Sequence, residues 1–270
     1  MNQFYVITNE KKDKTLEITY RIKQYIEQQG KQCVLATESP EVPGDTECIL
    51  VLGGDGTLIR AARDLHSKDI PLLGINIGTL GYLTEADISN LEECLHQLIY
   101  GETHVEERMM LKGTVNGEGE DIALNDIVLT RSGALRVIKF NVYVNGEMLN
   151  TYHSDGIIVS TPTGSTAYNL SAGGPIVEPT AAMIVITPIC SHALNTSSIV
   201  LSAEDEIILE VGEGHHGDEE EVSISFDGEH SILLRTGDKV VIKKAEDKTE
   251  LLKLSKVSFL EILRKKMKGN

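Results

Sequence analysis

The segment Gly53–Thr57, with the sequence Gly-Gly-Asp-Gly-Thr, is the part of the chain whose residue types point most directly to chemistry. It follows the apolar run Cys48–Leu52 and precedes a run with helical spacing, so it is expected to join a strand to a helix. Glycines let the backbone approach a ligand, and amides at a helix N-terminus bind anions such as phosphate. A carboxylate there repels phosphate, so Asp55 is expected to orient, or accept a proton from, a hydroxyl that attacks phosphorus. The simpler alternative is a tight turn in which Asp55 only caps the helix.

Two common nucleotide-binding motifs are absent from the sequence. There is no G-x-x-x-x-G-K-[ST] segment, so the glycine loop is not a P-loop. The dinucleotide fingerprint G-x-G-x-x-G is also missing, because Ile59 stands where its last glycine would be. Since the loop has no lysine of its own, a divalent cation is expected to carry most of the phosphate charge.

Asn125 and Asp126 form a second candidate, because these two polar residues interrupt the apolar run Ala123–Leu129. An amide beside a carboxylate suits the two hydroxyls and the base edge of a nucleoside. The alternative is a strand end or a bulge whose polar side chains are satisfied within the protein.

The segment Ser154–Pro175 is the third and longest candidate. It leads from a strand through a loop rich in glycine and hydroxyl side chains to a short helical turn and a Gly-Gly-Pro sequence. So many small polar residues are costly to bury unless they form hydrogen bonds. A ligand or a tight packing role is therefore expected, and we favour the ligand over a purely structural loop.

The composition limits the classes of partner. The chain has 270 residues, 41% of them hydrophobic, and a formal net charge of −16, which disfavours nucleic acid because a strongly acidic protein repels polyanions. No stretch of about 18 apolar residues is present, so no membrane association is expected. Met1–Ile7 resembles a strand and lacks the basic start of a signal peptide. The four cysteines show no CxxC spacing. We expect a cytoplasmic protein with reduced thiols.

Strand and helix signals alternate up to residue 103. Within this stretch, for example, Leu58–Leu65 has the pattern of a helix and Ile70–Ile75 that of a buried strand. This rhythm predicts an α/β domain with a mostly parallel sheet. From residue 104 to 251 short strands follow one another, among them Ile122–Thr130 and Val240–Lys243, which predicts an all-β domain. The tail returns to helix at Phe259–Met267, and we expect residues 252–270 to pack back on the N-terminal domain.

The three candidate segments together resemble the bacterial NAD kinases, and the likeness spans nearly the whole chain. Thr187–Cys190 and Phe226–Gly228 add to it. The glycine loop alone is shared with phosphofructokinases and lipid kinases, whereas Asp155–Val177 is specific. The resemblance implies an N-terminal α/β domain, a C-terminal β domain and a site between them. It implies phosphorylation of the 2′-hydroxyl on the adenosine ribose of NAD by ATP, giving NADP, with Mg²⁺ or another divalent cation.

The resemblance also implies roles for individual residues. Asp55 would be the proton acceptor, with Gly56 against the dinucleotide and Arg60 near a phosphate. Asn125 and Asp126 would hold the adenosine part of NAD. The other residues implied to bind NAD are Arg136, His153, Asp155, Thr166, Ala167, Tyr168, Asn169, Leu170 and Ser171. At the position of His153, arginine is common in the family. The resemblance implies no residue as a metal ligand.

Two other functions share part of this pattern. A lipid or sugar kinase could carry the same loop, but a lipid kinase needs a basic or amphipathic surface, and here only Arg264–Lys268 is basic. A non-catalytic dinucleotide sensor would bind NAD(H) or NADP(H) without needing Asp55. The phosphate donor stays open between ATP and polyphosphate, and the resemblance implies a homodimer or homotetramer without giving its size. Preference between NAD and NADH, and feedback by NADP, are also open.

Overall fold

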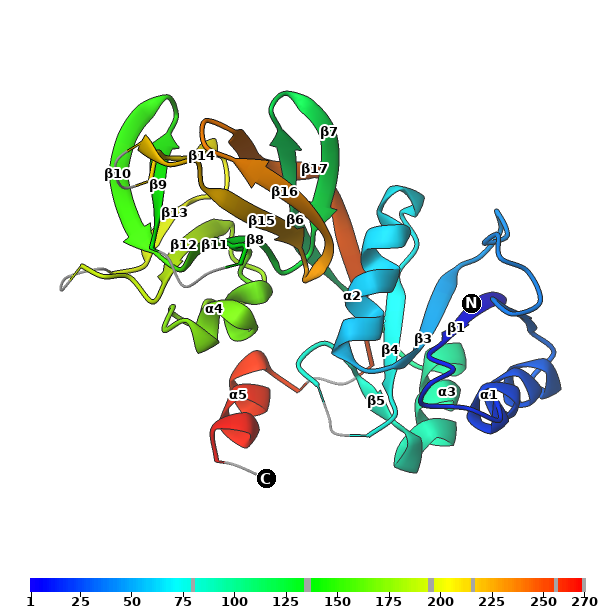
Figure 1. Ribbon diagram of the computed structural model, residues 1–270. Coiled ribbons are helices and arrows are strands. Elements are labelled where there is room, and N and C mark those ends of the chain that lie inside the picture. Colours follow the sequence, from blue (N-terminus) through cyan, green and yellow to red (C-terminus); the bar gives the residue numbers. More distant parts are fainter. Residues whose placement is uncertain (79–80, 134–136, 194–196, 215–216, 255–256, 269–270) are drawn as a thin grey trace. The chain divides into compact units, whose positions relative to one another are not determined.

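The computed structural model describes residues 1–78, 81–133, 137–193, 197–214, 217–254 and 257–268 (Figure 1). The chain divides into two compact units, which we call unit 1 (Met1–Glu107 with Thr249–Asn270) and unit 2 (Arg108–Lys248). The divisions expected from sequence lay after residues 103 and 251. Unit 1 is therefore built from both ends of the chain, with unit 2 inserted between them.

Unit 1 is a parallel sheet covered by helices. Its strands run in the order β2-β1-β3-β4-β5, all parallel, and Leu251 of β17 pairs with Leu72 of β4. The strands are β1 (Gln3–Thr8), β2 (Gln32–Leu35), β3 (Cys48–Gly53), β4 (Leu72–Asn76) and β5 (Ala86–Asp87). The helices are α1 (Glu17–Gln28), α2 (Asp55–Asp64), α3 (Leu91–Tyr100) and α5 (Phe259–Met267), with short 3₁₀ turns η1 (His66–Lys68) and η2 (Ile88–Asn90).

Strand β3 shows why the sheet of unit 1 is covered on both faces. All six of its residues are buried, as expected for a parallel strand between two layers. Leu50 and Leu52 belong to the core cluster that includes residues of α1 and α3, and these two helices contact each other. Ile49 and Val51 point to the opposite face because side chains alternate along a strand. Helix α2 packs on β3 and β4 outside that cluster, and this arrangement places its N-terminus directly after β3.

Unit 2 is a β-sandwich. One sheet is antiparallel with the order β13-β12-β11-β8-β15-β16, and the other contains β10-β9-β14-β17, with β6 pairing β17 and β7 pairing β6. The first sheet contains β8 (Asp126–Arg131), β11 (Gly156–Ser160), β12 (Met183–Ile189), β13 (Ile199–Ser202), β15 (Glu221–Phe226) and β16 (Glu229–Arg235). The second contains β6 (His104–Val115), β7 (Glu118–Ala123), β9 (Ile138–Val144), β10 (Glu147–Ser154), β14 (Ile207–Val211) and β17 (Lys239–Lys253). Between β11 and β12 lie the 3₁₀ turn η3 (Gly164–Thr166) and the one-turn helix α4 (Tyr168–Ser171).

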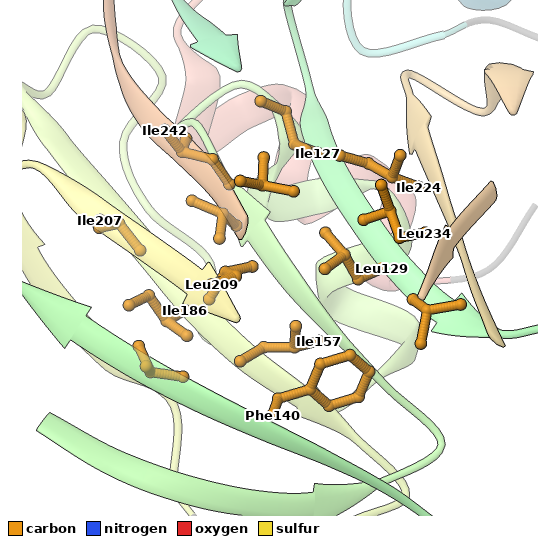
Figure 2. Close-up of a cluster of buried hydrophobic side chains, with 14 of the residues drawn as sticks. Ile127, Leu129, Phe140, Ile157, Ile186, Ile207, Leu209, Ile224, Leu234 and Ile242 are labelled. Atoms are coloured by element: carbon orange, nitrogen blue, oxygen red, sulfur yellow. The ribbon is translucent and has the colours of Figure 1, made fainter. Parts of the chain in front are cut away.

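The core of unit 2 fills the space between its two sheets. Figure 2 shows Leu129 and Ile157 of the first sheet close to Phe140 and Leu209 of the second. All four side chains are fully buried and belong to one cluster. Apolar burial of this kind contributes about 25 cal/mol per Å², so this interior is the main source of stability for the frame that carries the loops of unit 2.

Three expected elements have different limits in the structure. Helix α2 begins at Asp55 rather than Leu58, so the aspartate of the glycine loop lies in its first turn. The run Ile122–Thr130 is not one strand, because β7 ends at Ala123 and β8 starts at Asp126. Strand β17 has 15 residues, far beyond the expected Val240–Lys243, and its last residues belong to unit 1.

The C-terminal helix forms over the expected residues and belongs to unit 1. Helix α5 begins after Ser258, whose side chain accepts a hydrogen bond from the amide of Glu261. The Lys266 ammonium lies 5.3 Å from the centroid of the Tyr82 ring, a cation–π contact within unit 1. Within the described part of the chain, no helix combines the length and apolar character needed to cross a membrane.

Candidate functional site

The glycine loop lies where β3 leads into α2. Gly54 is the N-cap residue of the helix, with extended backbone angles, and Asp55 and Gly56 begin the first turn. The amides of Thr57 and Leu58 both donate to the carbonyl oxygen of Gly54. The amides at the very start of a helix have no partner within it, so those of Asp55 and Gly56 can donate to an anion.

The Asp55 carboxylate holds the loop that follows β4. It accepts hydrogen bonds from the backbone amides of Tyr82 (2.7 Å), Leu83 (3.1 Å) and Thr84 (3.3 Å). Gly81 approaches so closely that a β-carbon there would overlap the same carboxylate. Asp55 therefore has a fixed position and a structural task, besides any role toward a ligand.

Two amide side chains border the glycine loop. Asn9 donates from Nδ2 to the Thr57 hydroxyl at 3.0 Å. Asn76, at the end of β4, is 1% exposed and donates from Nδ2 to the carbonyl oxygen of Gly78 at 2.7 Å. The Oδ1 atom of Asn76 is buried and has no hydrogen-bond partner in the described part of the chain. A buried acceptor of this kind is costly unless a ligand or water supplies a donor.

Unit 2 contains a pocket of roughly 490 Å³, a volume usual for small-molecule sites. Four of its lining residues were expected from sequence to bind NAD, namely Asn125, Asp126, Ala167 and Tyr168. The other lining residues are Val128, Thr130, Ser225, Asp227 and Gly228. The pocket thus combines an amide, two carboxylates and an exposed aromatic ring, a set of groups that suits a nucleoside.

Asp227 organises one wall of this pocket, although its local sequence does not predict a place in the site. Its carboxylate accepts hydrogen bonds from the amides of Leu124 (2.8 Å), Asn125 (2.7 Å) and Asp126 (3.1 Å). Asp227 and Gly228 both have positive φ, of 52° and 73°, in the tight turn between β15 and β16. In the sequence, Asp227-Gly228 is an Asp-Gly pair between two runs of alternating apolar residues. Such a pair predicts a tight turn but not a contact with residues 124–126.

Asp126 is the buried titratable group of the pocket. It is 4% exposed, and no hydrogen bond to its carboxylate is found within the described part of the chain. Burial, and to a lesser extent the neighbouring Asp227 carboxylate, raise the pKa of Asp126 to about 7. A carboxyl group in this state can donate as well as accept a hydrogen bond near neutral pH.

The loop after β11 is held mainly by its own polar side chains. The hydroxyl of Thr161 donates to the carbonyl oxygen of Leu124 at 2.6 Å, and that of Ser165 to Pro162 at 2.6 Å. Asn169 is fully buried, donates from Nδ2 to the carbonyl oxygens of Ser165 and Pro175, and accepts from Thr187. This network presents Ala167 and Tyr168 to the pocket, and the polar atoms of the Asn169 side chain are engaged within the protein.

The sequence comparisons agree with this geometry. Residues 36–103 match the ATP-NAD kinase N-terminal domain, and residues 124–254 match the ATP-NAD kinase C-terminal domain. The chain belongs to the ATP-NAD kinase family. A curated NAD kinase from Lachnospira eligens is 46% identical over 99% of this chain and 100% of its own length. The chain is therefore an enzyme of the kinase class.

Two solved structures, of an NAD kinase and of an NADH kinase, share the fold. An NAD kinase from Archaeoglobus fulgidus, in complex with ATP, is 25% identical with a TM-score of 0.80, and the match covers 98% of each chain. A yeast NADH kinase complexed with NADH is 21% identical with a TM-score of 0.85, covering 100% of this chain and 88% of the other. The expected architecture of an N-terminal α/β domain, a C-terminal β domain and a terminal helix is confirmed.

The remaining residues implied by the NAD kinase family are spread over the two units. Arg60 is an exposed residue of α2 in unit 1. In unit 2, His153 is exposed on β10, and Asp155 forms an ion pair with Arg131 at 3.2 Å. Thr166, Leu170 and Ser171 lie in or beside α4, outside the lining of the pocket, and Arg136 lies outside the described residues.

Proposed function

We propose that the protein transfers the terminal phosphoryl group of ATP to the 2′-hydroxyl on the adenosine ribose of NAD, which gives NADP. The observation that carries this proposal is the pocket of unit 2, where Asn125, Asp126 and Tyr168 meet. The amide and the carboxyl group offer both donors and acceptors to ribose hydroxyls and a base edge, and Tyr168 offers a ring for stacking. The proposal is supported by relatives that bind NADH and ATP, respectively.

The glycine loop would bind the phosphate donor. Its first-turn amides and the positive end of the α2 dipole favour the terminal phosphates of ATP. Inorganic polyphosphate presents the same oxygens, so we propose it as an alternative donor. A loop made of backbone amides recognises phosphate groups rather than a base, and this is why both donors fit.

Asp55 would orient the attacking hydroxyl and take its proton late in the reaction. A ribose hydroxyl is a very weak acid and a carboxylate is a weak base, so full deprotonation before attack is unfavourable. In a loose phosphoryl-transfer transition state the nucleophile needs little prior charge. The three backbone amides that donate to Asp55 fix the position of its carboxylate, which suits alignment of the attacking hydroxyl.

Mg²⁺ or another divalent cation would accompany the donor phosphates. Among the described residues there is no group of three His, Cys, Asp or Glu side chains that could hold a metal ion by itself. We propose a cation that is bound mainly by phosphates and water, as Mg²⁺ commonly is. The buried Oδ1 atom of Asn76, for which the described residues supply no donor, could accept a hydrogen bond from a water of that hydrated ion. When bound, the ion would neutralise charge on the transferred group.

The assembly and location of the enzyme also belong to this proposal. We propose a cytoplasmic homodimer or homotetramer, as the family resemblance implies. Light scattering coupled to size exclusion gives the molar mass directly. A monomer at working concentrations would contradict this part of the proposal without affecting the reaction.

The reaction is tested by incubating the protein with ATP, Mg²⁺ and NAD and measuring NADP with an NADP-specific dehydrogenase. We expect NADP with its phosphate on the 2′ oxygen, identified by ³¹P NMR, and loss of product when EDTA removes the cation. Parallel reactions replace ATP by polyphosphate, or NAD by NADH, diacylglycerol or sphingosine. Phosphorylation of a lipid but not of NAD would favour a lipid kinase, and intact NAD binding without any product would favour a sensor.

A further inference from the structure

The segment between β1 and α1 brings a lysine to the glycine loop. The Lys12 ammonium donates to the carbonyl oxygen of Ile77 at 3.3 Å, a contact between residues 65 positions apart. It also lies beside Gly54, as shown by the distance of only 2.9 Å between Nζ and the position that a β-carbon on that glycine would take. Within the described part of the chain, no carboxylate forms an ion pair with Lys12. An ammonium group has three donors, so most of its capacity is available to a ligand.

The backbone that carries Lys12 is fixed at both ends. The amides of Lys12 and Asp13 donate to the carbonyl oxygen of Asn9, and the Asn9 side chain donates to Thr57 in the glycine loop. Asp13 is buried and accepts hydrogen bonds from the amide and the hydroxyl of Thr19 in α1. Lys12 therefore projects from an ordered turn that is bonded directly to the loop.

A second observation points to a ligand at the same place. The Oδ1 atom of Asn76, buried and without a partner in the described structure, lies 3.8 Å from the same β-carbon position at Gly54. A cation and an unused acceptor thus face one small region of the loop. A phosphate group accompanied by a hydrated divalent cation satisfies both, since phosphate accepts from the lysine and the cation's water donates to Asn76.

We propose that Lys12 binds the terminal phosphates of the phosphate donor at the glycine loop. It would take the place of the lysine that P-loop enzymes carry inside the loop itself. Because Lys12 lies outside the loop in sequence, the P-loop pattern does not include it. The proposal rests on the proposed function for the identity of the donor, but binding of a polyphosphate chain to Lys12 is a separate claim.

Steady-state kinetics with three variants tests the proposal. Lys12→Met should raise the KM for ATP about 10-fold, the effect of losing one charge-assisted hydrogen bond, and leave the KM for NAD within about twofold. Lys11→Met is the matched control, because Lys11 is the exposed neighbour in the same turn, and it should change neither constant. Lys12→Arg keeps the charge and should recover most of the affinity for ATP. Equal KM values for ATP in Lys12→Met and Lys11→Met would overturn the proposal.

Calorimetry separates this proposal from the proposed function. Titration with tripolyphosphate and Mg²⁺ requires no NAD and no turnover, so it reports on Lys12 even if no NADP forms. We expect wild type to bind, Lys12→Met to bind about 10-fold more weakly at low ionic strength, and Lys11→Met to match wild type. A wild-type protein that binds neither tripolyphosphate nor ATP would refute the assignment of Lys12.

A double-mutant cycle with Gly54→Ala adds a geometric test. Gly54 has φ −156°, which alanine tolerates, so the new methyl group would displace the flexible end of Lys12 rather than the backbone. Gly54→Ala should therefore weaken tripolyphosphate binding more in wild type than in Lys12→Met. Strictly additive effects would show that the two positions act independently and would count against the proposed contact.

Discussion

Each unit of the protein contains an aspartate that accepts hydrogen bonds from three consecutive backbone amides. The two cases differ in whether the aspartate is itself a residue expected to act on the substrate. In unit 1 the motif residue Asp55 itself binds the amides of residues 82–84. In unit 2 the amides of residues 124–126, in the link between β7 and β8, donate to Asp227 in the β15–β16 hairpin. Asn125 and Asp126 are thus positioned through their backbone, and their side chains are left to face the pocket.

The comparison shows two ways of building a site from a loop. In unit 1 one carboxylate holds a loop and, under the proposed function, would also orient the attacking hydroxyl, so a substitution of Asp55 is expected to disturb both. In unit 2 the two tasks are divided between Asp227 and the pair Asn125 and Asp126, so they can be separated by mutation. The following four substitutions test this division, from the largest expected effect to the smallest.

Asp55→Asn should lower turnover by about 10²–10⁴, the range for a general base, and leave NAD affinity within a few-fold. The amide oxygen can still accept from the loop amides, but the NH₂ group cannot, so a modest loss of thermal stability is also expected. Turnover is measured by NADP formation and affinity by calorimetry. A folded variant that has lost NAD binding would make Asp55 a binding residue instead.

Asp227→Ala should destabilise unit 2 by about 4 kcal/mol, because three amides of the pocket wall lose their acceptor. Urea unfolding measures this change. Asp69→Ala is a matched control for backbone strain, since Asp69 is exposed and has a similar φ of 49°, against 52° for Asp227. If both variants lose equal stability, strain rather than the lost hydrogen bonds explains the effect.

Asp126→Asn should change how stability depends on pH. The pKa of Asp126 is raised from 3.8 to about 7 in the folded protein, so the folded state binds this proton more tightly. Stability therefore falls as pH rises from about 4 to 7, and the whole contribution is lost above that window. Relative to wild type, the variant should gain on the order of 3–4 kcal/mol between pH 4 and pH 8. Parallel stability curves from urea unfolding across this range would contradict the role of burial.

Asn125→Ala should act mainly on substrate binding. Loss of its amide should raise the KM for NAD about 10-fold with little change in turnover, the effect of one or two hydrogen bonds. Asn150→Ala, at an exposed position of β10, serves as the control. An unchanged KM for NAD in Asn125→Ala would remove this residue from the binding site.

The sequence predicts the fold well where a local pattern decides it. Helix α5 occupies the expected residues because its spacing and the Ser258 cap agree. Helix α2 starts earlier than expected. Asp55 and Gly56 have low helix propensity, so the pattern predicts a later start, but they follow the N-cap residue Gly54, where propensity matters less than the geometry of the first turn. The break between β7 and β8 was visible as two polar residues, but pattern alone could not separate a strand end from a ligand site.

The parts of the site that escaped prediction depend on long-range contacts. Asp227 bonds to Leu124, 103 positions away, and Lys12 reaches Ile77 across 65 positions. Neither residue stands out in its own segment, because an Asp-Gly turn and a lysine in a polar loop are common. Asn169 shows the opposite case: its segment predicted a ligand contact, and its side chain is fully engaged inside the protein. Only the folded chain distinguishes these situations.

Strand β17 has a consequence for the order in which the protein can fold during synthesis. Its first residues pair with β14 in unit 2, whereas Leu252 and Leu254, at and just beyond its end, complete the core of unit 1. The core of unit 1 can therefore be completed only after Leu252 and Leu254 have left the ribosome, although β1 is synthesised before any part of unit 2. We expect ribosome-bound chains in which residue 248 is followed by a flexible linker long enough to clear the exit tunnel to protect unit 2 from protease while residues 1–107 remain cleavable.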